Sequence, residues 1–570
     1  MKKLSSTILT SVLVFLTATA FSQSTISKKY FGQNAWMPDT IGDVNNCAEP
    51  PCFLNGQLHK MWGDIKASGS GVIRFGGIAP DRNKPTNYQY IKMIDAVRAN
   101  GMEPIIQVPF HMNRYSAKQA AEIVKFINIT KGKGIKYFII GNEPNLVYKY
   151  TTAAQVATYF KAFATAMKAV DPSIMTVGPE VAWYDTRILN GLTTPGGADD
   201  ITGRDANGRL YLDIITFHTY PFNGTQTRSQ VVAELAGAGN FEDNLTELNK
   251  RVATCNAYHN RTGAIALKTA VTEANIAYAN AATDNLYGVG CNSFIGGQFW
   301  AELLAIGMKK GLEFVNLWSV VEGNNMESNI GFIEKGTNNK KPTYHHFKML
   351  ADNFRGTFCN GTDNMANVKA FGSQDGKQIA VMILNQDQGN TAHPYTVRLN
   401  TSAVTGTNVL KINIDANVNK EYTGTIDKES TTLLIFDMAG NITKKIEYKM
   451  KGQADLNLAP VVTQISNALV TSTTEKISTE EQGAFETKVY PNPSNGSFTV
   501  KMNTANATES DIKMSVINTI GQTVQVITPK ITNGYINEKI ELNSSFAAGL
   551  YIVQVMVGDN SYNTKMMVTK

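Results

Sequence analysis

Two glutamates follow short apolar runs in a way that could place two carboxylates in one active site. The first, Glu143, comes soon after the β-branched and aromatic run 137–140 and directly before Pro144. Proline cannot donate to a sheet ladder, so the strand must end there, and Glu143 must lie at its carboxyl edge, where parallel α/β folds bind ligands. The second, Glu273, follows the run 269–272 in the same manner. The alternative for Glu143 is a loop glutamate that caps the next helix.

A carboxylate pair of this kind can hydrolyse a glycosidic bond. One carboxylic acid protonates the leaving oxygen, and a second carboxylate attacks or stabilises the cationic sugar carbon. We expect Glu143 to be the acid and Glu273 to be the second carboxylate. Glu180, just beyond the run 175–178, is the alternative if one of these assignments is wrong. Otherwise Glu180 and Glu322 are loop or substrate-contacting residues.

Three side chains could tune these two acids. Arg74 and Tyr220 could hydrogen-bond Glu273 and hold it ionised, because an adjacent cation lowers the pKa of a carboxyl group. Glu143 has to stay protonated at the working pH. His218 could orient either acid or bind substrate. Arg74 could equally pair with a structural carboxylate, and His218 could be a buried histidine with satisfied hydrogen bonds.

Three further residues could contact a sugar. Asn142 could reach a hydroxyl beside the reacting carbon, and Trp318 offers a ring face for stacking. His111 follows the run 104–108, and we expect it to contact substrate. The alternative for Trp318 is a place in the hydrophobic core.

The elements that must position these residues alternate along the chain. We predict strands at 29–34, 71–75, 104–108, 137–140, 175–178, 214–217, 269–272 and 314–318, and helices at 88–100, 117–132, 152–170, 241–258 and 295–311. Eight βα units over ~310 residues predict an α/β fold, the (β/α)8 barrel. We expect it to span residues 24–354. In such a barrel, polar residues at the carboxyl ends of the strands face the active site, so the candidate residues should converge there.

The composition and the N-terminus indicate an exported globular protein. Of the 570 residues, 43% are hydrophobic and 18% are charged, so a sizeable core can be buried. The net charge of +6, without a basic run, gives no support for nucleic-acid binding. Lys2 and Lys3 precede an apolar run and small residues, which predicts a signal peptide at 1–23. No later run is apolar enough to predict a membrane span.

The cysteines and histidines bear on disulfides and metals. Cys47 and Cys52 form a plausible small loop closure, and Cys255 with Cys291 is a second candidate pair, which leaves Cys359 over. The Cys and His spacings do not match a zinc site, so we expect neither a metal nor another cofactor.

Two further regions follow the barrel. Strand patterns at 368–371, 379–384, 395–399, 409–415 and 431–437 predict a β-sandwich over residues 355–448. Residues 449–487 are rich in small and polar residues and are expected to form a linker. Strand patterns at 497–502, 511–518 and 549–557 predict a small all-β module over 488–570.

The barrel resembles the retaining glycoside hydrolases of clan A. The resemblance covers roughly residues 28–350, and the matching motifs come in the family's order: Arg74, Gly141-Asn142-Glu143-Pro144, His218-Thr219-Tyr220, Val271-Thr272-Glu273-Ala274-Asn275 and Trp318. Ala274 stands where the family often has an aromatic residue. The resemblance implies retention through a covalent glycosyl-enzyme on Glu273, with Glu143 as acid and then base. A β-sandwich after the barrel is common in its β-xylosidase, arabinofuranosidase and glucuronidase types.

The C-terminal module resembles the sorting domain of the type IX secretion system of Bacteroidetes. The matching residues are Tyr490-Pro491-Asn492-Pro493, Ile520-Gly521-Gln522, Gly549-Leu550-Tyr551 and the basic end 565–570. The resemblance implies export across both membranes and a secreted or cell-surface protein whose partner is this secretion machinery. The alternative is a generic carbohydrate-binding sandwich.

Taken together, the sequence predicts a secreted retaining hydrolase of β-glycosidic bonds in plant or algal polysaccharide. Two other classes stay open. One is a non-catalytic surface protein that binds glycans on a barrel scaffold. The other is a metal-dependent barrel hydrolase, which the seven histidines and the missing His-x-His pattern on the first strand do not favour.

Overall fold

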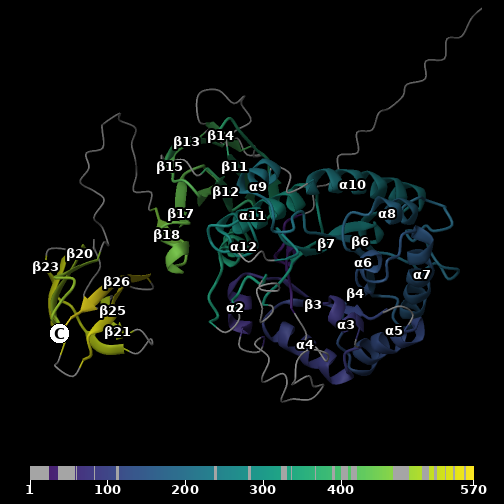
Figure 1. Cartoon of the computed structure of the whole chain (residues 1–570), viewed down its shortest axis with the longest axis horizontal. Coiled ribbons are helices and arrows are strands. Elements are labelled where there is room, and N and C mark those ends of the chain that lie inside the picture. Colours follow the sequence, from purple (N-terminus) through teal and green to yellow (C-terminus); the bar gives the residue numbers. More distant parts are fainter. Residues whose placement is uncertain are drawn as a thin grey trace, which may run out of the picture. The chain divides into compact units, whose positions relative to one another are not determined.

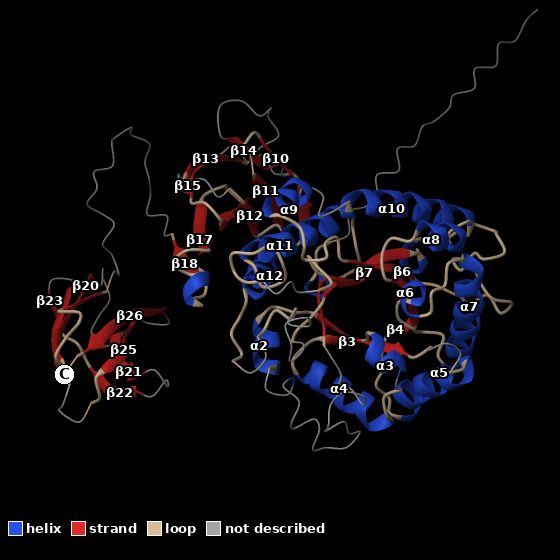
Figure 2. Cartoon of the chain, viewed as in Figure 1, coloured by secondary structure: helices blue, strands red, loops and turns tan. Residues whose placement is uncertain are grey.

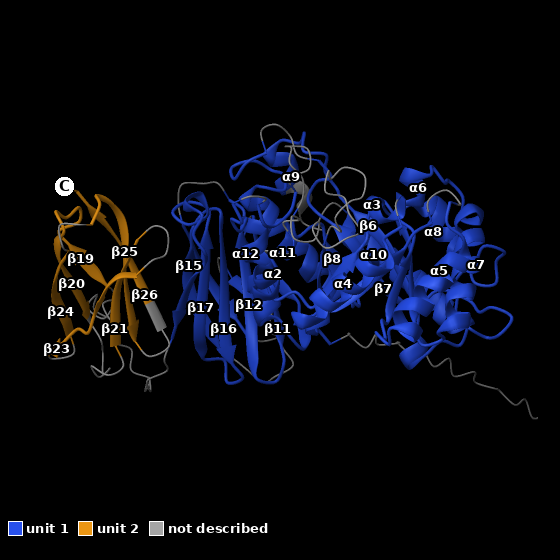
Figure 3. Cartoon of the chain, turned by 90° about the horizontal axis from the view of Figure 1, so that it is seen from below, with its two compact units in different colours: residues 1–468 blue, residues 469–570 orange. Residues whose placement is uncertain are grey.

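The structure is a computed structural model of the chain. It describes residues 25–569, except 36–57, 59–60, 83, 111–113, 236–239, 280–283, 322–329, 335–336, 366, 388–391, 400–408, 413–419, 466–486, 504–511, 519–522, 533–534, 543–545 and 558–559. The chain divides into two compact units, residues 1–468 and 469–570 (Figure 3). The predicted signal peptide lies outside the described residues.

The first unit contains the predicted barrel. Eight parallel strands close on themselves, since β1 pairs with both β2 and β8. The strands are β1 (Phe31–Asn34), β2 (Val72–Phe75), β3 (Glu103–Val108), β4 (Tyr137–Ile140), β5 (Met175–Val181), β6 (Ile214–Thr219), β7 (Lys268–Ala274) and β8 (Val315–Leu317). Helices surround them, so the strands are buried on both faces and read as continuous apolar runs (Figure 2).

The helices largely follow the predicted segments. They are α2 (Trp62–Ala67), α3 (Ile78–Arg82), α4 (Asn87–Ala99), α5 (Ala117–Val124), α6 (Pro144–Val147), α7 (Ala153–Val170), α8 (Thr186–Leu192), α9 (Arg228–Leu235), α10 (Phe241–Tyr258), α11 (Phe294–Lys309) and α12 (Pro342–Asn353) (Figure 1). Capping boxes begin α4, α5 and α7, where Thr or Ser at the N-cap pairs with Gln three residues later. The segment predicted as one helix over 117–132 changes to a π-helix at η3 (Lys125–Thr130).

The barrel interior has an apolar layer with a polar layer above it. Side chains two residues apart on a strand point to the same face. On four strands, the residue of the apolar cluster is followed two positions later by a buried polar residue: Val72 and Arg74, Ile105 and Gln107, Ile214 and Thr216, Ala270 and Thr272. This alternation places a buried polar layer at the carboxyl ends of the strands.

Two register shifts add carboxylates to this layer. On β7 the pairing with β6 moves from Phe217–Val271 to His218–Glu273, and on β5 it moves between Gly178 and Val181. A β-bulge re-aims the side chains at its position. Glu273 therefore joins Thr272 in facing the polar layer, and Glu180 reaches it from β5.

A β-sandwich completes the first unit. Its sheets have the orders β10-β14-β13-β15 and β18-β17-β16-β12-β11-β9. The strands are β9 (Thr357–Cys359), β10 (Gly361–Asp363), β11 (Val368–Gln374), β12 (Gln378–Asn385), β13 (His393–Arg398), β14 (Val409–Ile412), β15 (Glu421–Ile426), β16 (Ser430–Asp437), β17 (Ile442–Lys449) and β18 (Val461–Gln464). Strand β18 pairs with β17, so this sheet extends beyond the boundary at 448 that the sequence suggested.

One face of the sandwich packs in the hydrophobic core of the barrel, and a second cluster lies between its two sheets. Met382 and Leu433 of the sandwich belong to the same buried cluster as the residues of α11, every one of which except Lys309 is buried. From α11, the amide of Gln298 donates to the backbone carbonyl oxygens of Asn385 and Ser430, at 3.0 Å each. The two regions are therefore joined by packing and by buried hydrogen bonds.

The second unit is all-β and has its own core. Its two sheets have the orders β19-β20-β24-β23 and β22-β21-β25-β26. The strands are β19 (Lys488–Tyr490), β20 (Ser497–Asn503), β21 (Ile512–Asn518), β22 (Thr523–Ile527), β23 (Ile531–Thr532), β24 (Tyr535–Glu541), β25 (Gly549–Val557) and β26 (Asn560–Val568). Their apolar residues form a separate cluster that includes Phe498, Ile536 and Val553.

One disulfide prediction is wrong. Cys255 is a free thiol whose Sγ donates to the carbonyl oxygen of Thr193, whereas the Sγ of Cys291 lies 3.3 Å from the carbonyl oxygen of Ala277. The two sulfurs are buried against different segments, which explains why they do not pair. Cys47 and Cys52 lie outside the described residues. Within the described part of the chain, every helix is too short or too polar to cross a membrane.

Candidate active site

Arg74 is the centre of the polar layer. Its side chain has no exposed surface, and its guanidinium donates to acceptors from several strands. The partners are Asn34 Oδ1 at 2.8 Å, Glu273 Oε1 at 2.9 Å, Glu180 Oε2 at 2.8 Å, Asn142 Oδ1 at 2.9 Å and Gln107 Oε1 at 3.5 Å. Gly76 leaves room for this group, because a Cβ there would lie 2.6 Å from the guanidinium carbon. Arg74 therefore donates both to Glu273, as one prediction had it, and to a structural carboxylate, Glu180, as the alternative had it.

Glu180 is a saturated, buried carboxylate. Its Oε1 accepts from the hydroxyl groups of Thr216 at 2.6 Å and Thr272 at 2.7 Å. Its Oε2 accepts from Arg74 at 2.8 Å and lies 3.3 Å from His218 Nε2. Burial opposes the ionised form, but the charge of Arg74 and the contacts with His218 and Thr216 lower the pKa of Glu180 to about 2.

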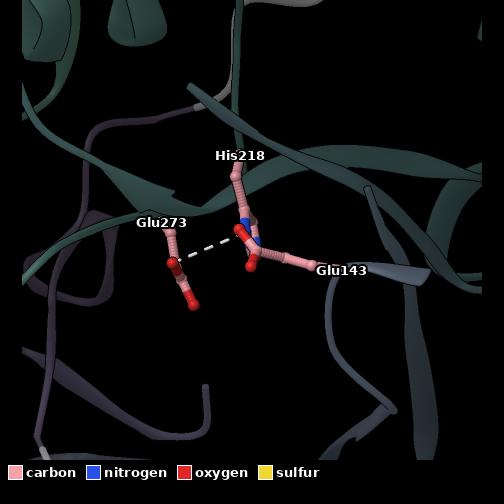
Figure 4. Close-up of side chains that lie close together, drawn as sticks. All are labelled: Glu143, His218 and Glu273. Atoms are coloured by element: carbon pink, nitrogen blue, oxygen red, sulfur yellow. Dashed lines mark hydrogen bonds and ion pairs between the residues drawn. The ribbon is translucent and has the colours of Figure 1, made fainter. Parts of the chain in front are cut away.

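His218 links three carboxylates. Its Nδ1 lies 3.0 Å from Glu143 Oε1 and 3.5 Å from Glu273 Oε2, and its Nε2 faces Glu180. Figure 4 shows the three side chains close together, with a dashed line for the contact between His218 and Glu273. Burial opposes the charged imidazole, but Glu273, Glu143 and Glu180 together raise the pKa of His218 to about 10. His218 is therefore an imidazolium at neutral pH.

Glu273 differs in one respect from the prediction. The expected hydrogen bonds are present, from Arg74 at 2.9 Å and from the hydroxyl group of Tyr220 at 2.9 Å. Burial nevertheless raises the pKa of Glu273, and the attraction of His218 and Arg74 only partly offsets it. The prediction considered the adjacent cation alone and left out the cost of burying the carboxylate.

Glu143 lies at the mouth of this network. It has a left-handed backbone with φ 45°, and its N–H donates to the carbonyl oxygen of Glu180 at 2.9 Å. Its side chain is 15% exposed, compared with 7% for Glu273. Glu143 occupies the N-cap position of α6, but its side chain makes no capping hydrogen bond. The alternative that Glu143 caps the next helix is therefore met in position and not in contact.

Of the other predicted site residues, the structure describes Asn142 and Trp318. Asn142 is buried with its Oδ1 held by Arg74, which fixes the amide group beside Glu143. Trp318 is only 7% exposed and belongs to the core cluster, and its ring packs over Gly77, where a Cβ would lie 2.7 Å from the ring. His111 and Glu322 lie outside the described residues.

Sequence reasoning missed the supporting polar residues. Asn34, Gln107, Thr216 and Thr272 contact Arg74 or Glu180, and all are buried. Gln107 also accepts from the N–H of Gly77 at 2.8 Å. The signal was available, since each of them is a polar residue near the end of an apolar run.

One group of side chains has the composition of a metal site. One ligand atom each from Glu143, His218 and Glu273 lies within 4.8 Å of the others. The three side chains lie close enough together to share a proton.

Comparison with solved structures agrees with this architecture. The chain is similar to AbfB, a family 51 α-L-arabinofuranosidase from Bifidobacterium longum, with 13% identity and a TM-score of 0.50 over 71% of this chain and 95% of that chain. It is also similar to a monomeric β-xylosidase from Caulobacter crescentus CB15, with 14% identity and a TM-score of 0.47 over 72% and 96%. The likeness to AbfB shows the fold, a (β/α)8 barrel followed by a β-sandwich. No curated protein matches the chain.

The C-terminal unit has a match of its own. Residues 488–569 match the family described as the secretion system C-terminal sorting domain. These residues are a type IX sorting domain. The sorting domain directs the protein out of the cell or to its surface.

Proposed function

We propose that the protein is a secreted retaining glycoside hydrolase that cleaves β-glycosidic bonds of plant or algal polysaccharide. The observation that carries the proposal is the spacing of Glu143 and Glu273, which each place an oxygen within 4.8 Å of the other. Carboxyl groups in retaining enzymes are about 5–5.5 Å apart, whereas inverting enzymes leave about 6.5–9.5 Å for a water molecule.

The network supports a division of roles in a double displacement. Glu143 gives its proton to the leaving oxygen as the glycosidic bond breaks and Glu273 bonds to the sugar carbon. Glu143 then takes a proton from the incoming water, whose oxygen bonds to the same carbon as the bond to Glu273 breaks. Glu143 is the more exposed of the two and so the better placed to meet that water. Arg74 and Tyr220 hold the two oxygens of Glu273, which fixes the direction of attack.

Exposed aromatic side chains support a polymeric substrate. Trp183 follows β5 and is 43% exposed, and Tyr278 and Tyr287 follow β7 and are each 61% exposed. All three lie on connections that leave the carboxyl ends of strands, which is the face that carries Glu143 and Glu273. Exposed aromatic rings at such positions can stack on sugar rings beyond the one that reacts.

The test is sugar release from β-glucans, xylans, mannans, galactans and aryl β-glycosides. Glu273→Ala should lower kcat/KM by at least about 10⁴-fold because it removes the attacking group. Glu143→Gln should lose about 10²–10⁴-fold on polysaccharide, and less on an aryl glycoside whose leaving group needs little protonation. NMR of the first product should show the β-anomer, and EDTA should leave the rate unchanged.

The outcomes separate the proposal from its alternatives. Glycan binding without cleavage by the wild type would favour a non-catalytic binding protein, and an α-product would exclude retention. Loss of activity in EDTA would favour a metal-dependent hydrolase.

A further inference from the structure

Glu180 is a third carboxylate that the double displacement does not use. Both of its oxygens are occupied by donors, and its side chain has no exposed surface. A carboxylate with these contacts can neither reach a sugar nor exchange a proton with one. It is therefore neither an acid nor a nucleophile, which removes it as an alternative to Glu143 or Glu273.

Glu180 touches the two cations that touch the reacting carboxylates. Arg74 donates through Nη2 to Glu180 and through Nη1 to Glu273. His218 faces Glu180 with Nε2 and faces Glu143 and Glu273 with Nδ1. Each of the two side chains thus contacts Glu180 through one nitrogen and a proposed reacting carboxylate through another.

We propose that Glu180 is a positioning residue, whose carboxylate contacts Arg74 and Nε2 of His218 and orients both side chains toward Glu273 and Glu143. The catalytic part of this proposal rests on the proposed function, whereas the protonation of His218 can be tested without it. Thr216 and Thr272 hold the other oxygen of Glu180 and keep the carboxylate plane fixed.

The charges around Glu180 indicate what its removal would do. The groups that face it are Arg74 from β2, His218 from β6 and Glu273 from β7, with Glu143 after β4 and the phenol of Tyr159 on α7. With Glu180 and Glu273 ionised, Arg74 and His218 charged, and one proton on Glu143, the charges cancel. Replacing Glu180 by a neutral residue leaves one excess positive charge, so we expect His218 to release its proton at lower pH.

The test is Glu180→Gln in the full chain. We expect kcat to fall about 10- to 100-fold through misplacement of the reacting groups, with little change in KM. The basic limb of the kcat/KM profile should move to lower pH by at least one unit. Asn34→Ala is the matched control, because it removes a neutral partner of Arg74; it should lower kcat without moving the basic limb.

A second measurement does not depend on catalysis. Histidine-selective ¹⁵N labelling gives signals from seven histidines, and His218→Asn identifies the signal of His218. Wild-type His218 should stay doubly protonated between pH 5 and 9, whereas in Glu180→Gln it should titrate within that range. Glu180→Gln should also add little further loss of kcat to the His218→Asn variant.

The outcomes distinguish the two proposals. If wild type cleaves no glycoside but its His218 behaves as expected, the proposed function fails and the role of Glu180 in protonating His218 stands. If Glu180→Gln folds, as circular dichroism would show, but leaves the His218 signal and the basic limb unchanged, the positioning role is wrong. If Glu180→Gln does not fold, the same titration is made in a Thr216→Val/Thr272→Val variant, which removes the two hydroxyl groups that hold Glu180. The proposal expects the His218 signal to titrate at lower pH in this variant, and an unchanged signal would contradict it.

Discussion

The chain carries two all-β regions after its barrel, and they differ in how they relate to it. The sandwich encloses a cluster between its two sheets, which includes Ile383 and Val397, but the other face of one sheet places Met382 and Leu433 in the same cluster as α11. The sorting domain encloses a cluster of its own, with Ile536 and Val553 at its centre. One region is part of the barrel's folding unit, and the other is a unit by itself.

The difference matches what each region has to do. A sorting domain has to be recognised by the secretion machinery regardless of the protein that it accompanies, so a self-contained core suits it. The sandwich instead covers α11 and α12, whose residues are buried almost throughout. We therefore expect damage to the sandwich to spread to the barrel, and damage to the sorting domain to stay local.

Truncation should give the largest contrast. A chain that ends at residue 354 leaves the apolar surface of α11 and α12 uncovered, and we expect it to be insoluble or unfolded. A chain that ends at residue 468 keeps the whole first unit and should keep its thermal unfolding temperature. Circular dichroism and gel filtration of both chains test this; a soluble, cooperatively folding 354-residue chain would contradict the shared core.

A core substitution in the sorting domain should have a large but local effect. Ile536 is fully buried in β24, so Ile536→Ala should destabilise that domain by ~2–5 kcal/mol. Calorimetry of the full chain should show only the transition of the sorting domain shifting downward. The exposed Val526→Ala on β22 is the control, and a joint shift of both transitions would show that the two units are coupled.

Acid should weaken the first unit and spare the second. Burial on α12 lowers the pKa of His345 to about 4 and that of His346 to about 3, below the ordinary value of 6.5. Below pH 6.5 these two histidines bind protons in the unfolded chain but stay neutral in the folded one. The free energy of unfolding is therefore highest above pH 6.5 and falls as the pH drops toward 4. We expect a loss of about 2–4 kcal/mol between pH 6.5 and 4.5.

The chain supplies controls for this pH dependence. Residues 469–570 contain no histidine, so the sorting domain should not show the loss. Glu180 and His218 titrate elsewhere, since Glu180 gains protons only below about pH 4.5 and His218 loses its proton near pH 10. Burial raises the pKa values of Glu273 and Asp363, so these groups favour the folded chain as the pH falls and oppose the loss. Urea unfolding at several pH values measures the slope. A slope unchanged in His345→Gln/His346→Gln would show that other groups cause it.

Breaking the polar contact between barrel and sandwich should have the smallest effect. Gln298→Leu leaves the buried carbonyl oxygens of Asn385 and Ser430 without their donor, at a cost of ~1–3 kcal/mol. The loss should appear in the transition of the first unit. Thr254→Val, on the exposed face of α10, should change it by less than about 0.5 kcal/mol. Equal effects of the two substitutions would show that the polar contact adds nothing to the shared core.

The strands and the convergence of Glu143 and Glu273 at one site were predictable because they leave local signals. Apolar runs mark the buried strands, and the residues after them fall at one end of the barrel, so Glu143, Glu273 and Arg74 could be named from the sequence. The role of Glu180 could not, because the bulge that re-aims it appears only when β5 pairs with β6. The same holds for the cysteines, since sequence spacing says nothing of the different carbonyl oxygens that Cys255 and Cys291 contact.

The contacts of Arg74 have a consequence for how the barrel is completed. Its partners lie on β1, β3, β5 and β7 and after β4, and Glu273 is 199 residues further along the chain. A nascent chain without β7 would bury Arg74 with part of its charge uncompensated, which is costly. A strand added in the wrong register would do the same, because a slip by one residue turns Glu273 away. The polar cluster at the candidate site thus also penalises incomplete or misregistered barrels, so only a correctly closed barrel buries Arg74 with all of its partners.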